Sequence, residues 1–147
     1  ILPNKKVKDQ LSSFTPQKKL EDDIKTFYDI VENVEVYNKN KNTKSLYDLS
    51  AIGLLYYWGD TIGLTKMGRE YARRVDDIDF KKEFCELAKR PYKINKAVEI
   101  IKDKNIKNIT EFKAESKELV ENINSKEYKK ASYGKIYNWA KFIIENS

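Results

Sequence analysis

The chain has 147 residues, and its 29 basic side chains outnumber 23 acidic ones to give a formal net charge of +6. It contains no histidine and one cysteine, Cys85, which excludes an internal disulfide and the imidazole-based sites of many enzymes. No stretch approaches the roughly 20 consecutive apolar residues of a membrane-spanning helix, and no signal peptide is recognisable. These features favour a cytoplasmic binding protein without a cofactor, and the positive charge makes nucleic acid the first partner to consider.

The first 16 residues show no sustained periodicity and are predicted to form a lead-in arm. Apolar side chains then recur every three or four residues from Gln17 to about Tyr37, which predicts a long amphipathic helix. A polar stretch rich in Asn and Lys follows over 38–44 and is predicted to be an exposed loop. Ser45 is expected to cap the next helical stretch.

Residues 45–62 have helical spacing interrupted by glycine, which predicts two short helices, the second over about 51–62. That second helix would be apolar on two sides, so the aromatic run Tyr-Tyr-Trp at 56–58 is expected to pack in the core or between the halves of the protein. Base stacking by these rings is the alternative. Three glycines in 59–68 then predict a tight turn that includes a strand.

The rest of the chain is predicted to be helical. Thr65 is positioned to cap a short helix over 66–74, and Asp79 to cap another that begins at Phe80. Pro91 should end that helix, because its ring and missing N–H disfavour continuation. The later helices are expected over Tyr92 or Lys93 to Asp103, over 111–123 with Thr110 as cap, and from Ser125 or Ser132 to Glu145, with Ile136, Trp139, Ala140 and Ile143 buried.

The segment 49–71 resembles the end of a winged-helix domain, in which a strand with the pattern Leu-Gly-Leu runs into Leu-Thr-x-x-Gly and a basic helix. The matching runs here are Ile-Gly-Leu at 62–64 and Leu-Thr-Lys-Met-Gly-Arg at 64–69. The closing run 128–143 is similar to the basic, Trp-containing helix of tandem winged-helix specificity modules in type II restriction endonucleases and related defence proteins. The resemblance implies a mainly α protein with minor β structure, built from tandem winged-helix or helix-turn-helix modules.

This resemblance divides the chain into a lead-in arm over 1–16, a first winged-helix-like module over 17–78 and a second helical module over 79–147. Two features depart from the family pattern. The wing between Ile62 and Thr65 is expected to be nearly absent. Lysines stand at 129 and 130, where such recognition helices often carry an arginine pair, so bidentate guanine readout is not expected there.

The last predicted helix carries a polar stripe. At 100° per residue its outward side holds a lysine at 130, a glycine at 134 and three further polar side chains. Its lysines suit phosphates, Asn138 suits adenine and Tyr137 suits a sugar or thymine methyl, whereas a solvated surface helix is the alternative. The contacts expected from this segment are Lys126, Lys129, Lys130, Lys135, Tyr137, Asn138 and Lys141.

The first half offers a second basic group. It comprises the loop lysines and the arginines that follow the glycine-rich turn, two of which share a helix face. An ion pair of Arg73 with Glu70 or Asp76 is the alternative to DNA contact. The contacts expected from this group are Lys39, Lys41, Lys44, Arg69, Arg73 and Arg74.

No catalytic or metal site is expected in this chain. The strings Asp-Lys at 103–104 and Glu-Phe-Lys at 111–113 contain nuclease-like residues, but they lie at predicted helix ends without a strand to present them. The acidic pair Asp22 and Asp23 and the group at 76–79 do not have the spacing of a calcium loop. They are interpreted as helix caps or solvated charges.

We therefore predict a duplex-DNA recognition module, the specificity part of a larger restriction or defence protein. The chain begins with Ile1 rather than methionine, so any nuclease domain is expected elsewhere, fused or associated. The alternative is a protein–protein interaction or homodimerisation module without nucleic-acid binding, because ten Tyr, six Phe and two Trp also suit interfaces. A small nuclease is a third, weaker hypothesis.

Overall fold

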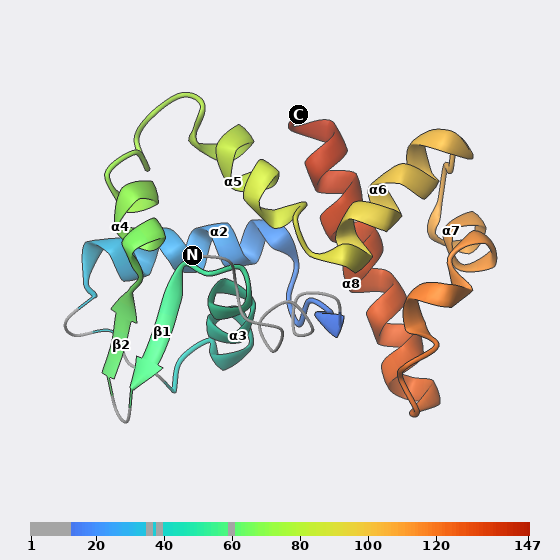
Figure 1. Ribbon diagram of the computed structural model, residues 1–147, viewed down its shortest axis with the longest axis horizontal. Coiled ribbons are helices and arrows are strands. Elements are labelled where there is room, and N and C mark those ends of the chain that lie inside the picture. The colour runs from blue at the N-terminus through green and yellow to red at the C-terminus, as the bar shows by residue number, and fades with distance from the viewer. Residues whose placement is uncertain (1–12, 35–36, 38–39, 59–60) are drawn as a thin grey trace.

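The structure is a computed structural model that describes residues 13–34, 37, 40–58 and 61–147, except for the side chains of Tyr57 and Trp58. This part of the chain is mainly helical with one two-stranded sheet (Figure 1), which confirms the predicted mainly α class with minor β structure. No helix within it is long and apolar enough to cross a membrane. In chain order the elements are α2 Leu20–Glu32, α3 Thr43–Ala51, β1 Leu55–Trp58, β2 Thr61–Leu64, α4 Lys66–Ala72, α5 Phe80–Ala88, α6 Tyr92–Asp103, α7 Ile109–Glu115, the 3₁₀ helix η1 Lys117–Val120 and α8 Lys126–Glu145.

The helices divide into two groups that share one core. Figure 1 shows α2, α3, the two strands and α4 on one side, α6, α7 and α8 on the other, and α5 between them. The aromatic ring of Phe27 on α2 lies 6.1 Å from that of Phe80 and 5.9 Å from that of Phe84, both on α5. The hydrophobic core therefore continues across the predicted module boundary between residues 78 and 79.

Residues 55–58 and 61–64 pair as the two strands of a β-hairpin. β1 pairs with β2 in antiparallel register from Leu55 opposite Leu64 to Trp58 opposite Thr61. Gly53, with a φ of 91°, follows the end of α3 in a conformation that favours glycine, and the bulky run after it suits a strand. The helix predicted over 51–62 is therefore wrong. The strand expected within 59–68 is confirmed as β2.

Thr65 joins α4 to the hairpin. Its Oγ1 accepts a hydrogen bond from Gly68 N at 2.9 Å, which confirms the predicted cap, and donates one to Gly53 O at 2.5 Å. Its backbone N donates to Leu54 O at 3.1 Å. These bonds draw α4 so close that a Cβ added to Gly68 would lie 2.0 Å from Leu54 O. The Leu-Thr-x-x-Gly run is thus a tight joint between the hairpin and the helix after it.

Two predicted helix starts in the first half are wrong. α2 begins at Leu20 and not at Gln17, because the N–H groups of Gln17 and Lys18 are bonded to the Asp48 carboxylate outside the helix. α3 begins at Thr43, two residues before the predicted cap Ser45, which is buried within the helix.

The helix predicted over 111–123 is also different. α7 begins at Ile109, because Asn108 Oδ1 accepts a hydrogen bond from Glu111 N at 2.9 Å, so the cap is not Thr110. Glu111 Oε2 in turn accepts one from Lys107 N at 2.7 Å, a reciprocal arrangement similar to a capping box. α7 ends before Ser116, whose hydroxyl donates to Phe112 O, and η1 follows.

The segment 14–20, here called the linking segment, runs between α3 and α8 (Figure 1). On one side, Asp48 accepts hydrogen bonds from Gln17 N at 2.8 Å and Lys18 N at 2.9 Å. On the other, Trp139 Nε1 donates to Lys18 O at 2.8 Å. Trp139 is fully buried, as predicted, and its ring lies 5.6 Å from that of Phe14. The linking segment therefore bonds the two helix groups together.

Lys93 at the start of α6 anchors the same segment. Although it is buried, its Nζ donates to Thr15 Oγ1 at 2.8 Å and to Asn122 Oδ1 at 3.0 Å. Burial lowers the pKa of Lys93. It forms no ion pair with the acidic side chains that the structure describes, so neutral oxygens hold it in place.

Replacing Gly134 in the middle of α8 by alanine is predicted to stabilise the protein. Nothing lies within 4 Å of the position that a Cβ would occupy. Because glycine inside a helix costs about 0.5–1 kcal/mol relative to alanine, Gly134→Ala should raise the free energy of unfolding by that amount in urea denaturation. The reverse change Ala131→Gly, at an exposed position of the same helix, is the control and should lower it similarly. A loss of stability in Gly134→Ala would show that the position is crowded.

Candidate nucleic-acid interface

Three lysines lie at the start of α8. Ser125 caps this helix, with its Oγ accepting a hydrogen bond from Tyr128 N at 3.3 Å, so Ser125 and not Ser132 opens it. Lys126 and Lys130 are exposed, and Lys129 is half-buried. Within the described part of the chain none of the three forms an ion pair. Their charge exceeds that of Glu127 in the same turn and adds to the positive end of the helix dipole, which makes this end of α8 attractive to anions.

Asn138 has a different role from the predicted one. Its Oδ1 accepts a hydrogen bond from Leu20 N at 3.1 Å, and so it supplies α2 with the cap that the side chain of Lys19 does not provide. The oxygen expected to meet an adenine is therefore used inside the protein. The sequence could not show this, because the two residues are 118 positions apart.

The C-terminal part of the predicted stripe has partners of its own. The ring of Tyr137 lies 5.2 Å from that of Phe112, and Lys141 Nζ lies 5.9 Å from the Tyr137 ring and 4.0 Å from Glu145 Oε1. These side chains border a hollow of about 270 Å³ that Glu21 and Glu145 also line. The two carboxylates weaken the positive field here, so the basic surface of α8 is confined to its first turns.

Lys135 lies between these two parts of α8. It is half-buried, and its charge lowers the pKa of Asp48 in competition with burial, which raises it. The positive charge of Lys135 is therefore shared between solvent and the buried Asp48 carboxylate.

The exposed side of α3 carries a candidate that sequence reasoning missed. Lys41 and Lys44 are exposed, and Tyr47, one turn beyond Lys44, is 49% exposed with its ring 6.0 Å from that of Phe14. The i, i+3 spacing of Lys44 and Tyr47 places them on one face of a helix that begins at Thr43, and this spacing was the available signal. Lys39 lies outside the described residues.

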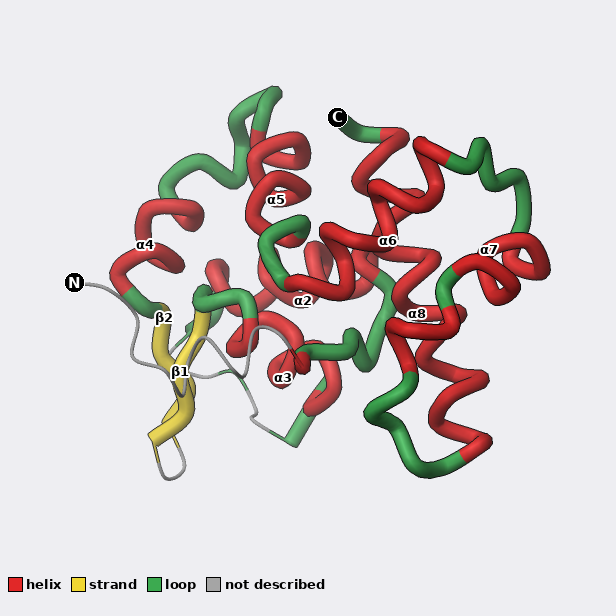
Figure 2. Tube along the Cα trace, turned by 45° about the vertical axis from the view of Figure 1, so that its right-hand side comes forward, coloured by secondary structure: helices red, strands yellow, loops and turns green. Residues whose placement is uncertain are grey.

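The start of α3, the end of the hairpin away from α4 and the start of α8 lie at one edge of the protein. Both views show them at the lower edge (Figures 1 and 2). α4 lies at the other end of the hairpin, toward the upper edge. The candidate interface is therefore the lower edge, with basic side chains from α3 and α8.

The arginines of α4 and of the turn after it lie away from this edge. Their contacts differ. Arg74 forms an ion pair with Glu83 of α5, and its guanidinium lies 4.9 Å from the Tyr71 ring. Arg69 Nη1 donates to Leu64 O at 3.1 Å. Arg73 is exposed and forms no ion pair with the described acidic side chains, including the expected Glu70 and Asp76.

Asp23 and Asp48 form a buried acidic pair next to the linking segment. Both are fully buried, so the interpretation of Asp23 as a cap or solvated charge is wrong. Burial above all, then the hydrogen bond and charge of Asp48, raises the pKa of Asp23 to about 10. Neither Asp23 oxygen has a well-aligned donor among the described groups, although the Ser45 hydroxyl lies close enough to lower this pKa somewhat. We infer that the pair holds one proton, on Asp23, which is donated to the Asp48 carboxylate.

Burial raises the pKa of Asp48 as well, but hydrogen bonds to this carboxylate oppose the rise. Hydrogen bonds from Asp23 and from the backbone N–H groups of Gln17 and Lys18 stabilise its carboxylate and oppose the effect of burial. Asp48 is therefore the member of the pair that keeps the negative charge, and its two oxygens hold the linking segment in place.

The described residues contain no group of three or more histidine, cysteine, aspartate or glutamate side chains that could hold a metal ion. Cys85 is buried, as predicted, and burial raises the pKa of its thiol to about 11, which disfavours the reactive thiolate. Comparisons of this chain with protein-family models, curated proteins and solved structures gave no match.

Proposed function

We propose that this protein binds duplex DNA through its lower edge, with the first turns of α8 as the main contact. The observation that carries the proposal is the lysine group at the start of α8, in which Lys126 and Lys130 are exposed and none of the three has an ion-pair partner among the described side chains. Lysines in such a position neutralise phosphates and release counterions, which gives affinity without sequence preference. Lys126, Lys129 and Lys130 are the residues assigned to this role.

The first half supports a second contact. The order α2, α3, hairpin, α4 is similar to the end of a winged-helix domain, and we assign α3 as its groove-facing helix and the hairpin as its wing. Lys44 and Tyr47 lie on the exposed side of α3. In this proposal the chain is a tandem winged-helix recognition module of a larger restriction or defence protein, and catalysis belongs to another domain.

A salt-titrated binding assay tests the proposal. Fluorescence anisotropy with a labelled duplex of about 20 base pairs should show affinity that falls steeply between about 50 and 200 mM salt. The double variant Lys126→Glu, Lys130→Glu should bind about tenfold more weakly or worse and reduce the salt slope by about two.

The matched control is Lys81→Glu with Lys82→Glu. These exposed lysines lie at the start of α5, at the upper edge of the protein, and the charge change is the same. The control should bind almost like the wild type. Equal losses in the two variants would mean that only net charge matters, and no binding at low salt would remove the proposal.

The exposed aromatic side chains favour the alternative of a protein–protein or dimerisation module. Tyr128, in the first turns of α8, is 69% exposed, and Tyr92 is 56% exposed. Aromatic residues at a surface are typical of protein interfaces. Sedimentation of the pure chain distinguishes the two functions, since a dimer that ignores DNA supports the alternative.

A further inference from the structure

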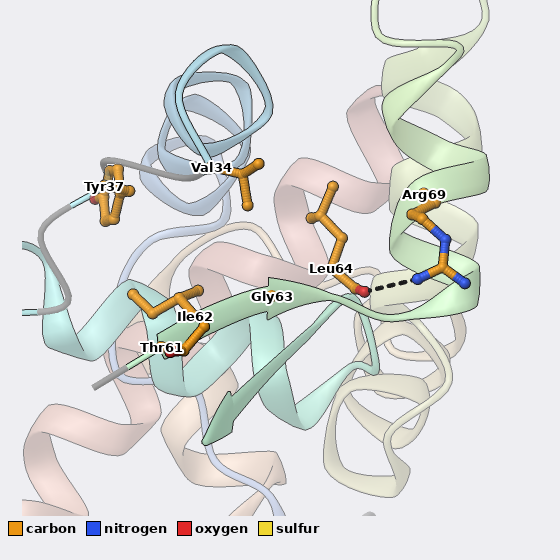
Figure 3. A pocket seen from close by; sticks show the side chains of 7 residues that line it. All are labelled: Val34, Tyr37, Thr61, Ile62, Gly63, Leu64 and Arg69. Atoms are coloured by element: carbon orange, nitrogen blue, oxygen red, sulfur yellow. Dashed lines mark hydrogen bonds between the residues drawn. The ribbon is translucent and has the colours of Figure 1, made fainter. Parts of the chain in front are cut away.

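A cavity lies along strand β2 of the hairpin. It has a volume of about 390 Å³ and opens between the end of α2 and strand β2 (Figure 3). The side chains of Val34, Ile62 and Leu64 form its apolar walls. This volume is within the range of small-molecule sites in proteins, which combine apolar walls with a few fixed polar groups.

The two ends of the cavity are polar. Arg69 lies at one end and Tyr37 at the other (Figure 3). The bond from Arg69 Nη1 to Leu64 O, 3.1 Å long, fixes the guanidinium at the mouth of the cavity. An arginine has five N–H donors, and among the described acidic side chains none pairs with Arg69. The guanidinium therefore retains donors and a positive charge for an incoming anion.

The opposite end offers a weaker polar contact. Tyr37 Oη accepts a hydrogen bond from Asn42 Nδ2 at 3.2 Å, which orients the hydroxyl while leaving its own hydrogen to donate. A ligand that extends from Arg69 along the apolar walls would reach this group. The cavity thus combines one cation, an apolar middle and a hydroxyl donor.

We propose that this cavity binds a small carboxylate with an apolar chain, its carboxylate on Arg69 and its chain between Val34 and Ile62. A single guanidinium compensates one negative charge, and its planar N–H groups match a carboxylate. A phosphate dianion would leave charge uncompensated against apolar walls. This inference is separate from DNA binding, because none of the lysines assigned to DNA contact is among the described residues that line the cavity.

The test uses octanoate as the probe and octanol as its uncharged counterpart. Methyl resonances of Val34, Ile62 and Leu64 are followed by NMR during titration of the whole chain. We expect octanoate to shift these resonances in a saturable way and to bind about tenfold more tightly than octanol. Arg69→Gln should lose about the same factor for octanoate only.

Two further variants make the result specific. Arg73→Gln removes an exposed arginine of the same segment that does not line the cavity, and it should bind octanoate like the wild type. Val34→Phe should block octanoate by filling the cavity while Arg69 stays in place, and thermal melts verify that each variant is folded.

Three results would overturn the proposal: equal binding of octanol and octanoate, equal losses in Arg69→Gln and Arg73→Gln, or resonance shifts only at methyl groups outside the cavity. None of these results bears on DNA affinity. Binding of the labelled duplex is measured separately, without octanoate, so that the failure of one proposal does not count against the other.

Discussion

Gly68→Ala should destabilise this protein by on the order of 3 kcal/mol, because it inserts a methyl group into the joint between the hairpin and α4. The added Cβ would lie 2.0 Å from Leu54 O and 3.3 Å from Thr65 Oγ1. The first of these atoms belongs to the backbone and cannot rotate away. Relief requires α4 to move away from Leu54, and that movement breaks the bonds that Thr65 makes to Gly53 O and Leu54 O. Urea denaturation measures the loss.

Gly63→Ala is the matched control for this prediction. A Cβ at Gly63 would lie 2.3 Å from the ring of Tyr56, which is nominally almost as close. The obstacle there is the end of a side chain that is 48% exposed and free to turn aside. The control should therefore lose clearly less stability than Gly68→Ala. Equal losses would mean that close contact alone, and not contact with backbone, decides the cost.

Asp48→Asn should also be severely destabilising, by about 2 kcal/mol or more. The two oxygens of Asp48 accept hydrogen bonds from Gln17 N and Lys18 N, and an amide retains only one acceptor oxygen. One backbone N–H would then face an NH₂ group in a buried place. The linking segment would lose its attachment to α3, which chemical denaturation at pH 7 measures.

Asp23→Asn, unlike Asp48→Asn, should not lower the stability of the protein at neutral pH. Its amide N–H replaces the proton that Asp23 donates to Asp48, without a carboxyl that can ionise. In the wild type, Asp23 is protonated when folded, with a pKa of about 10, and ionises at its ordinary pKa of 3.8 when unfolded. Its contribution to stability is therefore complete below pH 4 and is lost as pH rises toward 10.

The pH dependence separates the two members of the pair. Asp23→Asn should equal or exceed the wild type in stability at pH 8 and remove a slope of about 1.4 kcal/mol per pH unit. Denaturation midpoints at several pH values between 5 and 9 provide the measurement. A variant as unstable as Asp48→Asn, with an unchanged slope, would show that Asp23 is ionised in the folded protein.

The second half of the fold was largely predictable because its helices have strong, unambiguous periodicity. In α8 the four side chains expected inside, Ile136, Trp139, Ala140 and Ile143, are all buried. α5 ends before Pro91 and α6 begins directly after it, which agrees with the break expected at this proline. In both helices the spacing of apolar residues and the packing in the fold favour the same buried face. The sequence alone was therefore sufficient to predict which side chains are buried.

The hairpin was missed for a physical reason. The apolar residues of 55–64 fit a helical period and also suit a strand, and a short apolar run does not distinguish the two. The glycine at 53 could have decided the matter, since its left-handed conformation separates α3 from β1. The strand expected within 59–68 is present as β2, but its partner β1 was not expected.

The site was predictable only where a side chain faces solvent. The exposed position of Lys130 follows from helix geometry alone. The buried roles of Asn138 and Asp23 cannot be derived from helix geometry, because their partners Leu20 and Asp48 lie on other elements. A polar side chain that caps a distant helix and one that meets solvent have the same local sequence pattern.

The linking segment has a consequence for how the protein is made. Its bonds to α8 join residues 118 and 121 positions apart, Leu20 to Asn138 and Lys18 to Trp139. A ribosome produces the early residues first, so Lys18 and Leu20 wait for these partners while most of the chain is synthesised. Lys18 and Leu20 therefore reach their native positions only after α8 has emerged, and a protein interrupted before that point retains an unfinished core.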